Sequence, residues 1–291
     1  MPELLVIYNE SAGSADEEAR TAALETLRGG GADVIEAPTG KKDLDEMLDS
    51  CPGRDVVVLG GDGTLHVVVA ALYRRDELEA RTVGLVPLGT GNDFARGLGI
   101  PLDPPVAARV VLAGRPQPLD LLVDNENGIV VNMVHLGIGA EASEGATPLK
   151  PVLGRLAYAA GALLAGVRSP GWRLRVTVDG RSAGDGRRVL MVGIGNGLTI
   201  GGGTPLAPRA RPDDGMADVV VSLTTGPLDR LAYALRLRRG THPGLRDVIT
   251  TRGREVTVEG DPVPVNADGE LSGPIAWRRW TVLPAAWRMF T

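Results

Sequence analysis

Cysteine is nearly absent from the sequence, since Cys51 is the only one among 291 residues. A single cysteine cannot close a disulfide within the chain or build a cysteine-based zinc site, so we expect a reducing compartment, the cytoplasm. Long hydrophobic runs are also missing. The longest, Leu156–Val167, is shorter than the about 20 residues that a membrane-spanning helix needs, and Leu4–Tyr8 is too short for a signal peptide. We therefore expect no transmembrane segment.

An excess of positive charge is missing as well. The 31 Lys and Arg residues are outnumbered by 36 Asp and Glu residues, which gives a formal net charge of −5. Proteins that bind nucleic acids need a basic surface to neutralise phosphates, so this charge argues against a nucleic-acid partner. The hydrophobic content of 43% and the mixed charges indicate a folded globular protein, and the length suits two domains.

The N-terminal part of the chain alternates short apolar runs with helix-like segments. Ser14 followed by Glu17, for example, is a capping-box start for a helix after the first apolar run. Such alternation predicts a parallel sheet with helices on both faces, an α/β domain of Rossmann-like type over residues 1–118. Strands are expected at residues 4–8, 33–37, 55–59 and 83–86, and helices at residues 14–27, 43–49, 64–73 and 104–112.

From about residue 119 the pattern changes to short stretches in which polar and apolar residues alternate, separated by Gly, Pro and Asp. Asp179-Gly180 is a hairpin-type turn. We expect a mainly antiparallel, β-rich domain over residues 119–283, and the C-terminal tail, about 284–291, could return to the first domain. Strands are expected at residues 173–178, 189–194, 218–223, 255–258 and 275–282, and helices at residues 152–167 and 227–239.

The strongest motif follows the third predicted strand. The apolar run Val56–Leu59 leads directly into Gly60-Gly61-Asp62-Gly63-Thr64, after which a helix begins. Glycines let backbone N–H groups approach a ligand, and a helix N-terminus carries partial positive charge, so this turn suits a phosphate. A tight turn that needs glycine only for its geometry would explain two glycines, but not three around a carboxylate.

Two further polar segments follow predicted strands in the same domain. Asn9 ends the first strand, and Gly89–Asp93 comes after the fourth. In open parallel sheets, ligands bind outside the carboxyl ends of the strands. We therefore expect Asn9, the Gly60–Thr64 turn and the Gly89–Asp93 turn to lie along one nucleotide-binding edge.

Four segments of the chain resemble one protein family in the order of their motifs. Gly60–Thr64 and Pro87–Arg96 resemble the diacylglycerol kinase catalytic-domain family, which includes sphingosine kinases and bacterial lipid kinases, and residues 195–215 and 266–270 resemble its later blocks. The GGDGT motif alone is also shared by NAD kinases, but the ordered set is highly specific. The resemblance implies an ATP- and Mg²⁺-dependent kinase that phosphorylates a hydroxyl of diacylglycerol or a related lipid at a membrane surface.

The resemblance also implies roles for individual residues. Asp62 would contact the catalytic Mg²⁺, and Asp268 would be the general base that takes the hydroxyl proton, with Glu270 beside it. Asp214 matches a carboxylate that binds a structural Mg²⁺ in some bacterial members, and Asp213 is its close competitor. The positions that match the ATP site are Asn9, Gly61, Asp62, Gly63, Thr64, Gly89, Thr90, Gly91, Asn92 and Asp93.

The chain departs from the family pattern beside its best motif. His66 and Val67 stand where many members have Asn and Glu, and Glu10 stands where they have Pro. The missing Glu removes a metal or helix-orienting contact, which keeps a second hypothesis open: a pseudokinase that binds lipid or nucleotide without turnover. A third hypothesis is a kinase of a soluble substrate, of the NAD kinase type.

Several candidates also have a purely structural explanation. Asp268 precedes Gly269 and could be a turn residue, and Asp213 and Asp214 could cap a turn. Residues 137–142 imitate a dinucleotide fingerprint, but no β-α-β unit follows, so we interpret them as a close-packed turn. The three histidines, His66, His135 and His242, have no metal-ligand spacing.

Membrane contact and assembly are the remaining questions. The helix at 152–167 could be plain core or could line an acyl-chain pocket. The arginines at 236–239 suit a solvated helix end, although an acidic protein acting on a membrane lipid needs some basic contact surface. We expect a cytoplasmic protein that associates peripherally with the membrane, and a homodimer is left open.

Overall fold

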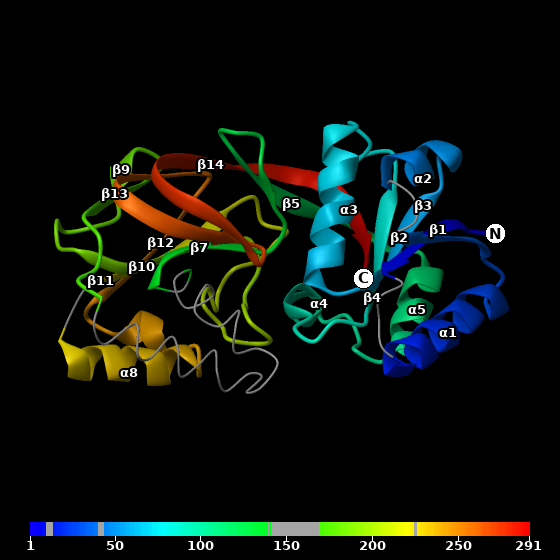
Figure 1. Cartoon of the computed structure of the whole chain (residues 1–291), viewed down its shortest axis with the longest axis horizontal. Helices are drawn as coiled ribbons and strands as arrows, with labels where there is room; N and C mark the ends of the chain where they lie inside the picture. Colours follow the sequence, from blue (N-terminus) through cyan, green and yellow to red (C-terminus); the bar gives the residue numbers. More distant parts are fainter. Residues whose placement is uncertain (10–13, 40–43, 139, 141–168, 224–225) are drawn as a thin grey trace. The chain divides into compact units, whose positions relative to one another are not determined.

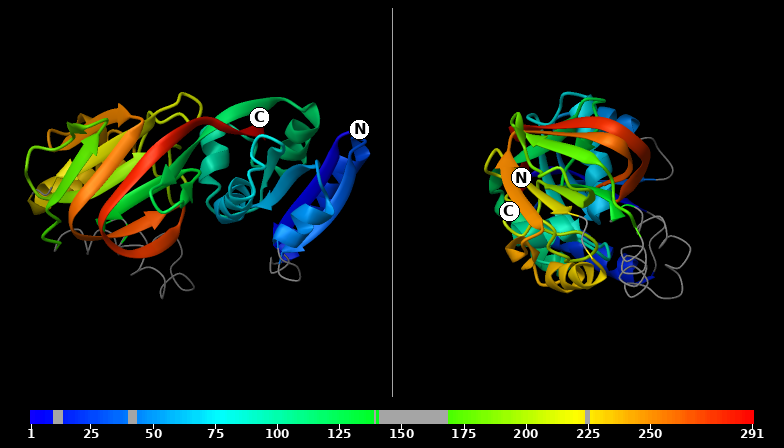
Figure 2. Two further views of the ribbon diagram at one scale, coloured as in Figure 1. Left: turned by 90° about the horizontal axis from the view of Figure 1, so that it is seen from above. Right: turned by 90° about the vertical axis from the view of Figure 1, so that its left-hand side faces the viewer.

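The computed structural model describes residues 1–9, 14–39, 44–138, 140, 169–223 and 226–291. The expected helix at 152–167 lies outside these residues. The chain forms two compact units, which are shown in Figures 1 and 2. The first unit comprises Met1–Leu121, Gly201–Gly203 and Pro284–Thr291, and the second comprises Leu122–Ile200 and Thr204–Leu283.

The first unit is built on a parallel sheet, as predicted. Its strands run in the order β4-β3-β1-β2, and the end of β14 (Glu270–Phe290) adds a further parallel strand beside β4, where Arg288 lies opposite Thr82. The last residues of the chain thus belong to this sheet, which β5 (Pro116–Asp124) joins by pairing with β14. The four N-terminal strands are β1 (Glu3–Asn9), β2 (Asp33–Thr39), β3 (Asp55–Gly60) and β4 (Thr82–Pro87).

Helices cover both faces of this sheet, with α1 and α5 on one side and α2 and α3 on the other (Figure 1). The interior strands have apolar central residues because both of their faces are buried: Val56, Val57 and Val58 have no exposed surface. One short helix, α4, was not among the expected helices. The helices are α1 (Ser14–Gly29), α2 (Leu44–Ser50), α3 (Asp62–Arg74), α4 (Asp93–Leu98) and α5 (Pro104–Ala113).

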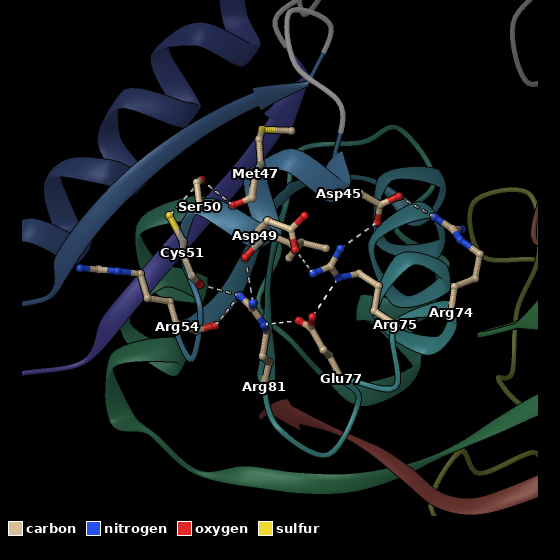
Figure 3. Close-up of polar contacts among 11 residues, drawn as sticks. Asp45, Met47, Asp49, Ser50, Cys51, Arg54, Arg74, Arg75, Glu77 and Arg81 are labelled. Atoms are coloured by element: carbon tan, nitrogen blue, oxygen red, sulfur yellow. Dashed lines mark hydrogen bonds and ion pairs between the residues drawn. The ribbon is translucent and has the colours of Figure 1, made fainter.

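A buried arginine closes the C-terminal end of α2 (Figure 3). Arg81 is 3% exposed and donates hydrogen bonds to the carbonyl oxygens of Leu48 (3.0 Å), Cys51 (2.9 Å) and Arg54 (3.3 Å). Its Nε lies 2.7 Å from the carboxylate of Glu77. The last carbonyls of a helix have no partner within the helix, and Arg81 supplies hydrogen bonds to a carbonyl of the last turn of α2 and to two carbonyls of the loop that follows.

The second unit is a β-rich domain of antiparallel strands, as predicted. Its strand order is β12-β11-β10-β7-β13-β14, with β8 paired to β13, and its core is mostly valine together with Trp280. The expected Asp179-Gly180 turn joins β8 to β9. The remaining elements are β6 (Ile129–Val130), β7 (Met133–Gly137), β8 (Leu174–Val178), β9 (Arg181–Ser182), β10 (Val189–Gly195), β11 (Ala217–Leu223), α8 (Pro227–Leu237), η1 (His242–Gly244), β12 (Val248–Gly253) and β13 (Glu255–Ala267).

Two local details bear on the sequence analysis. β14 has 21 residues and is far longer than the expected strand at 275–282, because it runs through both units. Gly137 has a φ of 87°, and a Cβ there would lie 2.6 Å from the carbonyl oxygen of Leu190. This supports close packing at Gly137, the start of the segment that imitates a dinucleotide fingerprint.

No described helix is long and apolar enough to cross a bilayer.

Candidate functional site

The two glycine-rich turns of the first unit touch each other through their backbones. β3 ends at Gly60, and α3 begins at Asp62 with Gly61 as its N-cap. A Cβ on Gly89 would lie 2.6 Å from the Cα of Gly61, and a Cβ on Gly61 would lie 3.1 Å from the Cα of Gly89. Contacts this short leave no room for side chains, so both turns need glycine for the fold itself.

Asp62 connects the first turn to the second. Its carboxylate accepts hydrogen bonds from the backbone N–H groups of Asp93 (2.9 Å) and Phe94 (3.0 Å), which are the first two residues of α4. A carboxylate at this place satisfies N–H groups that lack helical partners and complements the partial positive charge of the helix end. Asp62 therefore caps α4, although it belongs to α3.

Asp93 continues the connection to a distant part of the sequence. It is 5% exposed, and its two carboxylate oxygens accept from the N–H groups of Gly202 and Gly203, both at 2.7 Å. These glycines have φ values of 84° and 110°, which other residues rarely adopt. Two aspartates thus hold together three of the four segments that carry the family resemblance.

Asn92 lies between the glycine contact and α4. It adopts a left-handed conformation with a φ of 49° and donates from Nδ2 to the carbonyl oxygen of Gly89 at 2.6 Å. Its Oδ1 is buried and has no hydrogen-bond partner among the described residues. A buried oxygen of this kind is costly in the folded chain and is suited to accept from a ligand.

The other residues predicted for the ATP site lie on the same edge of the sheet. Asn9 ends β1, and the pairing of Tyr8 with Leu59 and of Gly60 with Pro87 sets the ends of the three strands side by side. Gly63 is exposed, and no atom lies within 4 Å of the position that a Cβ would take. The structure therefore brings together Asn9, Gly61, Asp62, Gly63, Thr64, Gly89, Thr90, Gly91, Asn92 and Asp93 at the carboxyl ends of β1, β3 and β4.

The two carboxylates of this edge lie close to Gly91. A Cβ on Gly91 would lie 3.2 Å from Oδ2 of Asp62 and 3.3 Å from Oδ2 of Asp93. The two carboxylates thus lie side by side at the edge where the ends of β3 and β4 meet. Each ionised carboxylate has about four lone-pair positions. Among the described residues, however, no three His, Cys, Asp or Glu side chains form a preassembled metal cluster.

Asp268 lies in the second unit, in the turn between β13 and β14. It has a φ of 50° and is followed by Gly269 at 96°, the left-handed pair typical of an Asp-Gly hairpin. Its carboxylate accepts from the N–H groups of Val131 (2.6 Å), Asn132 (2.9 Å) and Met133 (2.9 Å). The side chain is thus fixed against the β6–β7 connection. Glu270, which starts β14, is exposed.

Two buried asparagines support this arrangement and were missed in the sequence. Asn196 has no exposed surface and donates from Nδ2 to the carbonyl oxygen of Val131 at 2.7 Å. Asn132 donates from Nδ2 to the carbonyl oxygen of Thr199 at 2.9 Å. Residues 195–199, in the third family block, therefore fix residues 131–133, whose N–H groups bind the Asp268 carboxylate. The Gly-Asn-Gly at 195–197 was the only hint in the sequence, and such a segment does not reveal whether its asparagine is buried or lies in an exposed turn.

Asp214 and Asp213 have arginine partners in the structure. Asp214 accepts from the backbone N–H of Met216 at 3.1 Å and pairs with Arg252, while Asp213 pairs with Arg211 at 3.2 Å. Arg252 also reaches Asp218, whose pKa is raised by burial despite this opposing charge. A guanidinium thus stands beside the carboxylate that the resemblance assigns to a structural Mg²⁺.

Two of the residues that depart from the family pattern, His66 and Val67, lie on the first turns of α3, and the third, Glu10, lies outside the described residues. His66 is half-buried, and Val67 is 47% exposed. Val67 is therefore a surface side chain, and neither the core of the unit nor the Asp62 and Asp93 hydrogen bonds depend on it.

Comparisons with known proteins cover nearly all of the chain. Residues 3–123 match the family model "Diacylglycerol kinase catalytic domain", and residues 132–291 match "YegS C-terminal NAD kinase beta sandwich-like domain". A "Probable lipid kinase YegS-like" of Pseudomonas aeruginosa (strain UCBPP-PA14) is 34% identical over 298 residues, 98% of this chain and 93% of the relative. A protein of the same description from Enterobacter sp. (strain 638) is 30% identical over 275 residues, 90% of each chain. A crystal structure of a diacylglycerol kinase from Bacillus anthracis str. Sterne shares the fold, with a TM-score of 0.74 at 21% identity over 99% of this chain and 96% of that one.

Proposed function

Because the chain belongs to the diacylglycerol kinase family, among the YegS-like lipid kinases, we propose that it transfers a phosphoryl group from ATP, with Mg²⁺, to a hydroxyl of diacylglycerol or a related lipid at a membrane surface. The first unit would be the nucleotide-binding domain and the second the lipid-substrate domain. The observation that carries the proposal is that Asp62 and Asp93 join both glycine-rich turns to Gly202 and Gly203.

The edge formed by β1, β3 and β4 fits ATP. Gly61 and Gly63 expose backbone at the start of α3, where N–H groups and the helix dipole favour phosphate. Thr64 adds a hydroxyl on the same turn, and the unpartnered Oδ1 of Asn92 provides an acceptor. Holding the phosphates in one geometry is most of what phosphoryl transfer asks of a protein.

Asp62 and Asp93 fit the Mg²⁺ that accompanies ATP. This ion is usually bound by one or two carboxylates together with the substrate phosphates, rather than by an all-protein cage. It would neutralise charge on the phosphates during transfer. The second assignment, Asp214, fits less well, because Mg²⁺ would have to displace or share the carboxylate with Arg252.

Asp268 is proposed as the general base, with Glu270 beside it. The three backbone N–H groups fix the carboxylate in one orientation, which a base needs in order to take a proton from a positioned hydroxyl. Asn196 and Asn132 would act indirectly, by holding the segment that donates these hydrogen bonds.

The test is phosphorylation of extracted lipids in mixed micelles with labelled ATP and Mg²⁺, with the product identified by mass. We expect labelled product in the organic phase, and we expect Asp268→Asn to reduce turnover by about 10²- to 10⁴-fold. Asp179→Asn is the matched control, because Asp179 also starts a left-handed Asp-Gly turn and accepts from two backbone N–H groups. Equal turnover in the two variants would show that Asp268 is only a turn residue.

The same assay separates the two rival functions. An NAD kinase would leave labelled product in water when NAD is supplied. A pseudokinase, the hypothesis that His66 and Val67 motivated, would bind ATP and yield no product from any lipid.

A further inference from the structure

One helix of the second unit has apolar side chains on the side that faces away from the protein. On α8 the buried side chain is Tyr233, which is 8% exposed. Leu228, Leu231 and Leu235 are 81%, 42% and 54% exposed, and their spacing of three and four residues places them on one face. Single exposed leucines are common on protein surfaces, but no other described helix has more than one large exposed hydrophobic residue.

The same helix end is basic in an acidic protein. Residues 226–240 contain four arginines and one aspartate, whereas the whole chain has a net charge of −5. Arg238 and Arg239 follow Leu231 and Leu235 by seven and four residues, so the cations extend the leucine face. Within the described part of the chain, Arg236, Arg238 and Arg239 form no ion pair with a carboxylate.

We propose that this face of α8, formed by Leu228, Leu231, Leu235, Arg238 and Arg239, docks on a bilayer that contains anionic lipids. A helix with leucines on one face and arginines beside them can lie in the interface, with its apolar side chains below the headgroups and its guanidinium groups on the phosphates. The net negative charge of the protein is repelled by anionic lipids, so a local basic patch also determines which side of the protein faces the membrane. The choice of a lipid surface over a protein partner rests on the proposed function.

The experiment is co-sedimentation of the full chain with phosphatidylcholine vesicles that contain or lack phosphatidylglycerol, at low and high salt. The wild type should bind the anionic vesicles more tightly, and salt should weaken this binding. The double variant Leu231→Gln/Leu235→Gln should bind about tenfold or more weakly. Arg238→Gln/Arg239→Gln should lose most of the salt dependence.

Control variants separate docking from a change in fold. Leu102→Gln removes another exposed leucine, 37% exposed in the first unit, and should leave vesicle binding unchanged. Unchanged thermal unfolding of the α8 variants will show that they fold. If these variants bind vesicles as tightly as the wild type does, the inference is overturned. It is also overturned if the substitutions abolish a dimer but leave vesicle binding unchanged, because the face would then pair with a second copy.

Phosphorylation assays keep this inference distinct from the proposed function. The α8 variants should phosphorylate a short-chain diacylglycerol in solution like the wild type, but should be slower on the same lipid in anionic vesicles. Phosphorylation of vesicle lipid that ignores the α8 substitutions refutes docking through α8 and leaves the kinase proposal standing. Vesicle binding that depends on α8, without phosphorylation of any lipid, refutes the kinase proposal alone.

Discussion

Gly63 offers a way to separate the demands of the ligand from those of the fold. It is the second residue of α3, it is exposed, and a Cβ there would meet no atom within 4 Å. The structure therefore has room for alanine at this position. A need for glycine at Gly63 would have to come from a group that approaches the backbone, and the proposed group is a phosphate of ATP.

The Gly63→Ala substitution should move stability and binding in opposite directions. Alanine is favoured over glycine in a helix by about 1 kcal/mol, and near a helix start we expect a gain in the free energy of unfolding of about 0.5 kcal/mol. A methyl group against a closely approaching phosphate resembles overpacking, which costs about 1–3 kcal/mol. That range corresponds to an ATP affinity lowered about 5- to 150-fold.

Thermal unfolding without ligand and isothermal titration with Mg²⁺ and ATP measure the two effects on the same protein. The expected variant has an unchanged or higher midpoint of unfolding and a weaker affinity for ATP. Wild-type affinity in Gly63→Ala would refute the idea that a phosphate contacts this turn. A lower midpoint would show instead that the apo structure already needs glycine there.

Three more predictions follow from the packing and the charges. Gly89→Ala should lower the free energy of unfolding by about 1–3 kcal/mol, because its Cβ would meet backbone at 2.6 Å, and a midpoint in denaturant like that of the wild type would contradict the glycine contact. Arg81→Met should cost about 3–5 kcal/mol in the same measurement, whereas Arg74→Met, which removes an exposed side chain, should cost little; equal costs would refute the capping role. Burial lowers the pKa of His135 to about 4. Because the unfolded chain binds this proton at about pH 6.5, stability should fall by on the order of 3 kcal/mol as the pH drops from about 6.5 to about 4, and His135→Gln should show a smaller drop.

The strands and glycine turns of the first unit could be predicted because their causes are local. A parallel strand buried on both faces is a continuous apolar run, and Val56–Leu59 is such a run inside β3. α4 could not be predicted in this way. Its six residues include Gly97, and its start is capped by Asp62, which lies 31 positions before Asp93.

The loops of the candidate site could be predicted, but the hydrogen bonds that join them could not. Strand order placed Asn9, the Gly60–Thr64 turn and the Gly89–Asp93 turn on one edge. The hydrogen bond from the Gly202 N–H to Asp93 joins residues 109 positions apart in the sequence, and no periodicity or turn pattern predicts a contact between residues so far apart. Similarly, the sequence marked Asp268 as a turn residue or a base, and only the structure shows the three N–H groups that hold its side chain.

The first unit is assembled from three separate stretches of the chain, and this has a consequence for its synthesis. Strand β4 pairs with β3 on one side and obtains its second partner from residues 288 and 289 of β14. Trp287 stacks on Phe94, and its indole Nε1 donates to the carbonyl oxygen of Asp120 at 3.1 Å. A fragment that ends at Leu121 would therefore lack a strand, an aromatic partner and the two glycines that Asp93 binds. A ribosome making this protein can complete the first unit only after residues 284–291 have left the exit tunnel.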